Sequence, residues 1–152
     1  MSFVEVDASS TQAQWALRSY LEELEVRFGT PLDAELTAAR GATDFAPPHG
    51  LFVLAMDGDE VMACGGLAWL DHERGEVKRM WVAPPYRGRG VASRLLAHLE
   101  SLVAASGRRV VLLDTNDGLH EAIALYDKSG YERVERYNDN PHARLWFRKT
   151  LA

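Results

Sequence analysis

Hydrophobic residues along the chain change between the two-residue spacing of strands and the three-to-four-residue spacing of helices. A first helix is predicted after the N-cap oxygens that Ser9, Ser10 and Thr11 offer; it carries Trp15 to Phe28 and is stopped by Gly29. Two more are predicted from Val91 to the end signal Ser106-Gly107 and over 119–128. A short fourth helix is expected over 31–40, opened by Pro31, and a loop over 41–50. Strands are predicted over 3–6, 51–56, 61–70, 76–82, 110–113, 131–135 and 143–149.

The turns between these segments organise the strands. Asp57-Gly58 between two apolar runs is a strong hairpin signal, and Pro84-Pro85 ends the strand over 76–82 because proline cannot donate to a sheet. No repeat or linker interrupts the pattern. The sequence therefore predicts a single layered α/β domain over residues 1–152 with a central sheet.

Composition narrows the class of protein. The 152 residues are 47% hydrophobic and 26% charged, as in ordinary globular proteins, and the net charge of -5 argues against sequence-independent binding of nucleic acid. The N-terminus lacks the features of a signal peptide and no apolar run is long enough to span a membrane, so we expect a cytoplasmic protein without membrane contact. Cys64, the single cysteine, fits a packed core thiol better than a nucleophile. Without a Cys/His cluster, no metal is expected.

The segment from Pro85 to Ala92 lies between a predicted strand and a long helix, where backbone N–H groups and the helix dipole favour an anion. Gly88 and Gly90 leave the backbone accessible, and Arg87 and Arg89 add positive charge for a diphosphate. The alternative is a glycine turn with two solvated arginines. A dinucleotide fingerprint fits less well, because it needs three glycines and a later acidic residue, for which Asp114 is an imperfect candidate.

Arg87-Gly88-Arg89-Gly90-Val91-Ala92, preceded by Val82-Ala83-Pro84, resembles the Gln/Arg-x-x-Gly-x-Gly/Ala signature of GNAT acetyltransferases, with a likeness running from about 51 to 150. The resemblance implies an α/β (α+β) GNAT fold: a mixed, mostly antiparallel twisted sheet of six to seven strands flanked by about four helices. It also implies that the backbone of Met80 and Val82 pairs with the pantetheine arm of acetyl-CoA. The pyrophosphate would then lie on Arg87, Gly88, Arg89, Gly90, Val91 and Ala92.

The segment 122–131 resembles the family's second signature, Ala-x-x-Leu-Tyr-x-x-x-Gly-Phe/Tyr, and places the family's tyrosine at Tyr126. Tyr126 is the candidate donor to the departing thiolate, or else a core tyrosine. Glu76, eleven residues before Arg87, matches the catalytic glutamate of histone-type members; a surface glutamate is the alternative. The usual asparagine of this signature is replaced by Leu119, so Asn116 either substitutes for it near the cofactor or caps the helix.

By the same resemblance, the acceptor would bind between the first helix and the loop before the last strand. Tyr20, Glu23 and Tyr137 are candidates there, and Arg79 could hold a carboxylate, although glutamates and arginines also serve as solvated surface. Trp81 either lines this site or packs beneath a helix. The charges hint at an amino-acid-like or polyamine acceptor.

The leading functional hypothesis is an enzyme that moves an acetyl group from acetyl-CoA to a primary amine of a small molecule or peptide by direct attack. A catalytically silent acetyl-CoA sensor is the alternative, motivated by Leu119, and a module that binds NAD is a third. A homodimer stays open, because dimers are frequent among members of this family.

Overall fold

The structure is a computed structural model that describes residues 1–29, 43–141 and 143–152. The predicted helix over 31–40 and the first two residues of the loop predicted over 41–50 lie outside the described residues. The helices are α1 (Thr11–Phe28), α3 (Val91–Ala105) and α4 (His120–Lys128), with a short 3₁₀ turn, η2 (Pro84–Tyr86). The strands are β1 (Ser2–Glu5), β2 (Gly50–Asp57), β3 (Glu60–Trp69), β4 (Arg74–Val82), β5 (Val110–Thr115), β6 (Glu132–Val134) and β7 (Leu145–Thr150).

One seven-stranded sheet, in the order β1-β2-β3-β4-β5-β7-β6, forms the centre of the molecule. All neighbouring pairs are antiparallel except β4 and β5, which are parallel. The predicted mixed, mostly antiparallel sheet is confirmed, and every predicted strand is present with its ends shifted by a few residues. The described residues contain three α-helices where about four were expected.

The two faces of the sheet are covered by different helices. On one face α3 buries Leu95, Leu99 and Val103, one helical turn apart, against strand residues such as Val77 and Val111. On the other face α1 packs Ala13 and Leu17 over β2 and β3. Each buried leucine stabilises the fold by about 1.5–3 kcal/mol relative to exposure, so both layers are firmly anchored.

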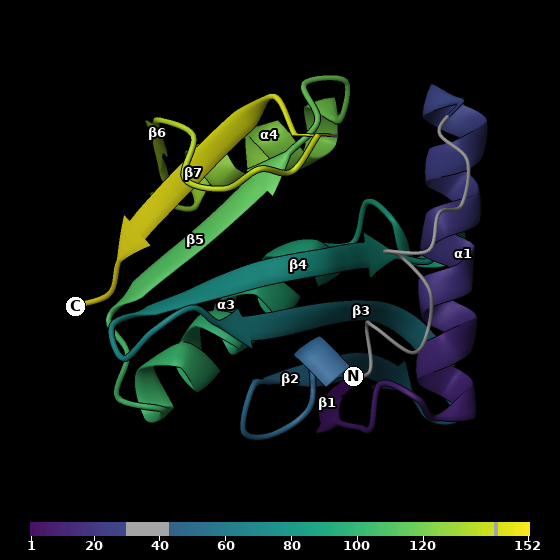
Figure 1. The fold of residues 1–152 in the computed structure, drawn as a ribbon. Helices are drawn as coiled ribbons and strands as arrows, with labels where there is room; N and C mark the ends of the chain where they lie inside the picture. Colours follow the sequence, from purple (N-terminus) through teal and green to yellow (C-terminus); the bar gives the residue numbers. More distant parts are fainter. Residues whose placement is uncertain (30–42, 142) are drawn as a thin grey trace.

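The parallel pair opens like a V. β4 and β5 pair only from Arg74 to Val77 and from Val110 to Leu113, although β4 continues to Val82. Figure 1 shows the two strands diverging toward their carboxyl ends, with α1 crossing beyond the tip of β4. The outer half of β4 therefore has a partner strand on one side and an open edge on the other.

A bulge in β4 sets the direction of its side chains. The register shifts between Cys64 and Gly66 of β3, and Arg79 has a φ of 54°, in the left-handed region that non-glycine residues rarely adopt. Beyond the extra residue the alternation is reversed. Trp81 consequently joins the α1 side of the core, whereas Val77 lies on the α3 side.

Candidate active site

A cavity of about 600 Å³ lies where β4 and β5 separate. Its walls come from α1, the outer half of β4, the turn before α3, the end of β5, α4 and the segment before β7. It contains most of the predicted site residues: Tyr20, Glu23, Arg79, Met80, Trp81, Val82, Arg87, Gly88, Gly90, Val91, Ala92, Asn116 and Tyr126. Arg89, Glu76 and Tyr137 do not line it.

The turn before α3 has the geometry of an anion site. Gly88 and Gly90 have φ angles of 78° and 75°, and a Cβ added to either would meet no other atom within 4 Å. Gly90 is the N-cap residue and offers no side chain to the first helical N–H groups, which come from Val91 and the residues after it. Glycine is required here by the backbone, and the space around it is open toward the cavity.

The open edge of β4 presents unpaired backbone groups. The N–H of Ala83 donates to the Met62 carbonyl on β3 at 2.8 Å, so the Val82 carbonyl points the opposite way, toward the cavity. There it accepts a hydrogen bond from Arg87 Nε at 2.9 Å. Because groups on a strand alternate, the backbone of Met80 faces the same edge as that of Val82.

Arg87 also bridges the cavity. Its guanidinium contacts the Glu23 carboxylate on α1 at 2.5 Å, and the same Glu23 oxygen accepts a hydrogen bond from Trp81 Nε1 at 3.5 Å. The neighbouring Glu22 and Glu25 on α1 are exposed and do not line the cavity, whereas Glu23 does.

Arg89 lies outside the cavity, with its guanidinium 5.8 Å from the centre of the Tyr86 ring. The two arginines of the turn therefore differ in direction, which the sequence did not indicate.

Tyr126 is a core tyrosine that also faces the cavity, so it has features of both interpretations made from the sequence. It is 6% exposed and packs against the rings of Tyr131 and Phe147, with centroids 6.0 and 5.4 Å away, yet it lines the cavity. Burial raises the pKa of its phenol far above the usual value, and the nearby Tyr20 and Asp114 add to the shift. The phenol is therefore protonated at neutral pH and can donate a hydrogen bond.

Residues of α1 and of the β4 bulge line another part of the cavity. Burial raises the pKa of Tyr20 to about 12, with Arg79 opposing the shift and Cys64, Asp114 and Glu23 contributing to it. The Arg79 guanidinium lies 4.9 Å from the centre of the Phe45 ring. Trp81 is 6% exposed and meets Trp15 edge-on at 5.8 Å, so it packs beneath α1 and lines the cavity at once.

Asn116 does not cap α4. Its Oδ1 accepts a hydrogen bond from Gly118 N at 2.8 Å, which closes a tight turn, and the N-cap position of α4 is Leu119, without a side-chain bond. The reading of Asn116 as a helix cap is wrong, and its side chain instead shapes the cavity wall after β5.

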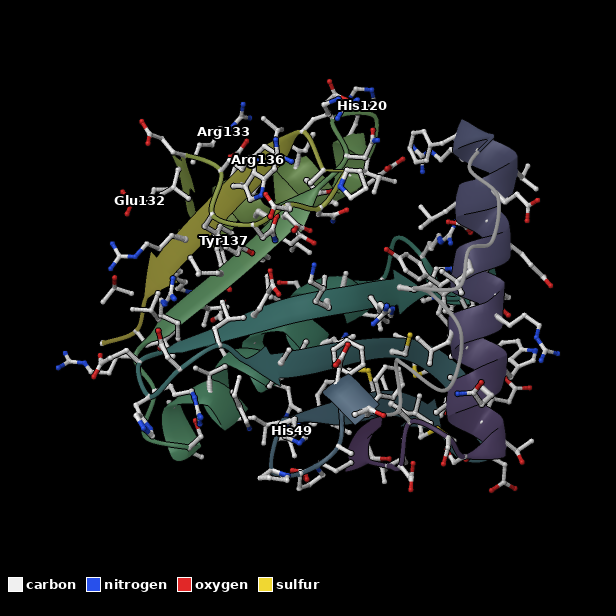
Figure 2. The ribbon with its side chains drawn as sticks, viewed as in Figure 1. His49, His120, Glu132, Arg133, Arg136 and Tyr137 are labelled. Carbon is white, nitrogen blue, oxygen red and sulfur yellow. The ribbon has the colours of Figure 1, made fainter. Side chains whose placement is uncertain are left out.

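Glu76 is buried, which rules out the surface-glutamate reading, but it lies behind the cavity wall. Its Oε2 accepts hydrogen bonds from the Tyr137 hydroxyl at 2.5 Å and from Asn138 Nδ2 at 3.1 Å. Burial raises the pKa of the Tyr137 phenol, and the charge and hydrogen bond of Glu76 raise it further. Figure 2 shows Tyr137 on the segment between β6 and β7, lying over the sheet. Tyr137 thus holds this segment against Glu76.

Three further polar residues line the same wall: Lys78, Asp114 and Asn140. Asp114 accepts hydrogen bonds from Asn138 at 2.6 Å and Asn140 at 3.2 Å, and Lys78 Nζ lies 3.4 Å from it. From the sequence, Asp114 was a candidate only for the acidic residue of a dinucleotide fingerprint. The available signal was its place at the carboxyl end of a strand, where open sheets bind ligands.

Other chemistry finds little support in the described part of the chain. Cys64 is fully buried and its burial raises the pKa of the thiol to about 12, so it behaves as a core thiol. Among the described residues, no three His, Cys, Asp or Glu side chains gather at a point where they could hold a metal. None of the described helices is long and apolar enough to span a membrane.

Comparisons with known proteins agree with this geometry. The model of the acetyltransferase (GNAT) family matches residues 13–131. The chain is 36% identical over 128 residues to the IAA acetyltransferase of Azospirillum brasilense, with 82% of each chain covered. A GNAT family acetyltransferase from Staphylococcus aureus superposes with a TM-score of 0.85 at 17% identity, over 99% of both chains.

Two further solved structures contain the ligand of the family. An aminoglycoside 6'-N-acetyltransferase complexed with coenzyme A has a TM-score of 0.72 at 20% identity, covering 99% of this chain and 97% of that one. A family member from Elizabethkingia anophelis with acetyl-CoA bound has a TM-score of 0.61 at 19% identity, covering 82% and 94%. At these identities they show the fold. Taken with the match over residues 13–131 and the Azospirillum relative, they show that this chain belongs to the GNAT family of acetyltransferases.

Proposed function

We propose that the chain transfers an acetyl group from acetyl-CoA to a primary amine of a small molecule or peptide. The observation that carries the proposal is one continuous cavity that joins an anion-binding turn to a polar end with carboxylates and aromatic side chains. A ligand with phosphates at one end and a reactive group at the other fits this arrangement.

The residues of the cavity suit acetyl-CoA on two counts. The open space above Gly88 and Gly90, with the first N–H groups of α3, would hold the pyrophosphate, helped by Arg87. The open edge of β4 at Met80 and Val82 would pair with the amides of the pantetheine arm. Acetyl-CoA supplies an activated thioester carbonyl. Arg89 would contribute only through long-range charge, since it does not line the cavity.

Arg87 would have to exchange partners when acetyl-CoA binds. In the structure it occupies both the Val82 carbonyl and the Glu23 carboxylate. An incoming pyrophosphate would draw the guanidinium toward the turn, which frees the Val82 carbonyl for the pantetheine arm and Glu23 for a cationic acceptor.

Tyr126 would donate a hydrogen bond to the sulfur as the C–S bond breaks. Its raised pKa keeps the phenol protonated over the physiological range, so the donor is always present. The acceptor amine would enter between Tyr20, Glu23, Arg79 and Trp81 and attack directly. Glu76 and Tyr137 do not line the cavity, so they would influence the acceptor amine only through the residues that do.

The alternative of a silent acetyl-CoA sensor rests on Leu119, which stands where the second signature usually has asparagine. The lined cavity beyond the turn argues for a second substrate and against this alternative. The named relatives act on unlike molecules, IAA in one case and aminoglycosides in another, so they do not choose the acceptor for this chain.

Isothermal titration with acetyl-CoA, with NAD as control, followed by a thiol-release assay over a panel of primary amines, tests the proposal. We expect acetyl-CoA to bind, NAD not to bind, and at least one amine to be acetylated. Gly90→Glu should abolish binding, because its carboxylate would repel the pyrophosphate. Binding without turnover of any amine would favour the sensor; absence of acetyl-CoA binding would overturn the proposal.

A further inference from the structure

Two buried carboxylates lie side by side at the acceptor end, and only one of them faces the cavity. Glu76 on β4 and Asp114 on β5 have side chains 7% and 8% exposed. The two carboxylates are nearly equally buried, and they differ in their place at the cavity: Asp114 lines it and Glu76 does not.

From this difference, and resting on the proposed function, we infer that Asp114 is the catalytic carboxylate that receives the acceptor's ammonium group, and that Glu76 is a positioning residue. Glu76 acts through the segment that follows β6. It anchors Tyr137 and Asn138, and Asn138 in turn donates to Asp114 at 2.6 Å.

The structure already contains an ammonium group in the inferred position. Lys78 lines the cavity, and its Nζ lies 3.4 Å from Asp114 Oδ2 and 3.7 Å from Glu76 Oε2. A primary ammonium can therefore approach Asp114 from the cavity side. An acceptor amine of the same chemistry would share the carboxylate with Lys78 or replace it.

The charges of this cluster favour a cationic acceptor. Among the described residues, Glu76 and Asp114 share the single ammonium of Lys78, and their other hydrogen-bond donors, Tyr137, Asn138 and Asn140, are neutral. The net charge of this set of contacts is -1, which favours the approach of a cation at a buried site, although the Arg79 guanidinium also lines the cavity.

The orientation of Asp114 is fixed on both oxygens. Asn140 donates to Oδ1 at 3.2 Å and Asn138 to Oδ2 at 2.6 Å. Asn138 is itself held by Trp146 Nε1, which donates to its Oδ1 at 2.9 Å. A carboxylate held in this way reorganises little when an amine binds, and such preorganisation is typical of catalytic groups.

The ammonium of the acceptor gives one proton to the Asp114 carboxylate, and the neutral nitrogen forms a C–N bond with the acetyl carbon while the C–S bond breaks. The nitrogen then loses a second proton. Of the two protons, one ends on the CoA sulfur and the other in solvent, leaving an N-acetyl amide and CoA thiol.

The test compares kcat/KM for the best amine of the panel across matched variants. Asp114→Asn should lower kcat/KM by about 100-fold or more, because it removes the proton acceptor. Acetyl-CoA affinity should be unchanged, which shows that the cavity is intact. Asp114→Glu should have a kcat/KM at least about tenfold higher than that of Asp114→Asn, since a carboxylate is restored. Asp117→Asn, an exposed aspartate just beyond the same strand, is the matched control and should behave as the wild type.

Two further variants separate catalysis from the ordering of the segment after β6. Asn138→Ala removes hydrogen bonds to both carboxylates and leaves Asp114 in place, and Glu76→Gln removes the buried charge that Tyr137 contacts. Each should cost about tenfold or less, mostly as a higher KM. The inference is overturned if Glu76→Gln is as damaging as Asp114→Asn, if Asn138→Ala reproduces the whole loss, or if Asp114→Asn is active. A wild type that acetylates no amine overturns the proposed function and this inference together.

Discussion

The turn before α3 allows a sharp test, because a second glycine, just beyond the other end of the same helix, provides a matched control. Gly90 at the start of α3 has a φ of 75°, and Gly107 just beyond its end has a φ of 89°. A Cβ added to either would meet no other atom within 4 Å. Gly90 lines the cavity and Gly107 does not, so alanine at the two positions imposes the same strain at different distances from the site.

Both variants should lose similar stability. An alanine in the left-handed region destabilises the folded state by about 1–2 kcal/mol, whereas the lower conformational entropy of the unfolded chain offsets about 0.4–1 kcal/mol of this. The net loss of unfolding free energy is therefore ~1 kcal/mol. For a chain of this length such a loss lowers the Tm by about 2–4 °C. Thermal unfolding monitored by circular dichroism measures it.

Only Gly90→Ala should weaken acetyl-CoA binding, because its methyl group would occupy the space where an anion approaches the backbone. We expect a Kd at least about 10-fold higher by isothermal titration, which corresponds to ~1.4 kcal/mol. Gly107→Ala should bind as the wild type does. Equal affinity of the two variants, with the expected fall in Tm, would refute the assignment of this turn to the phosphates.

Three other perturbations follow from the contacts of the site. Tyr126→Phe should lower kcat by about 100-fold with unchanged acetyl-CoA affinity. The neighbouring Tyr131 donates a hydrogen bond to Glu100, and Tyr131→Phe should keep the wild-type kcat. Equal kcat values of the two variants would remove Tyr126 from the mechanism. Glu23→Gln removes the partly exposed ion pair that holds Arg87 away from the turn, which is worth only ~0.5 kcal/mol, so acetyl-CoA should bind about twofold more tightly. In titrations at high salt this gain should vanish. Burial raises the pKa of the Cys64 thiol from 9.0 in the unfolded chain to about 12 in the native one. Between these two values the unfolded thiol loses its proton and the native thiol keeps it, so the free energy of unfolding falls by about 1.4 kcal/mol per pH unit as the pH rises. Cys64→Ala should reduce that slope in denaturant titrations at pH 9 and 10 and leave turnover intact.

The sequence by itself determined the fold and the turn. Strand and helix spacing is local information, and it located every strand of the sheet and all three described helices. Gly88 and Gly90, with the helix behind them, were identifiable because positive φ angles and unpaired helical N–H groups depend on a few adjacent residues. The second signature likewise located Tyr126, which lines the cavity as predicted.

Only the tertiary structure decided which way the polar side chains face. One extra residue at Arg79 reverses the alternation of β4, so whether Trp81 lies under α1 or α3 depends on a bulge that no local pattern encodes. Glu76, assigned to the site from its place eleven residues before Arg87, does not line the cavity and accepts a hydrogen bond from Tyr137, 61 positions later. Asp114 lines the cavity and contacts Lys78, 36 positions earlier, and Asn138, 24 positions later. Such contacts form only when the sheet is assembled, since the direction of each side chain is set by partners on other strands.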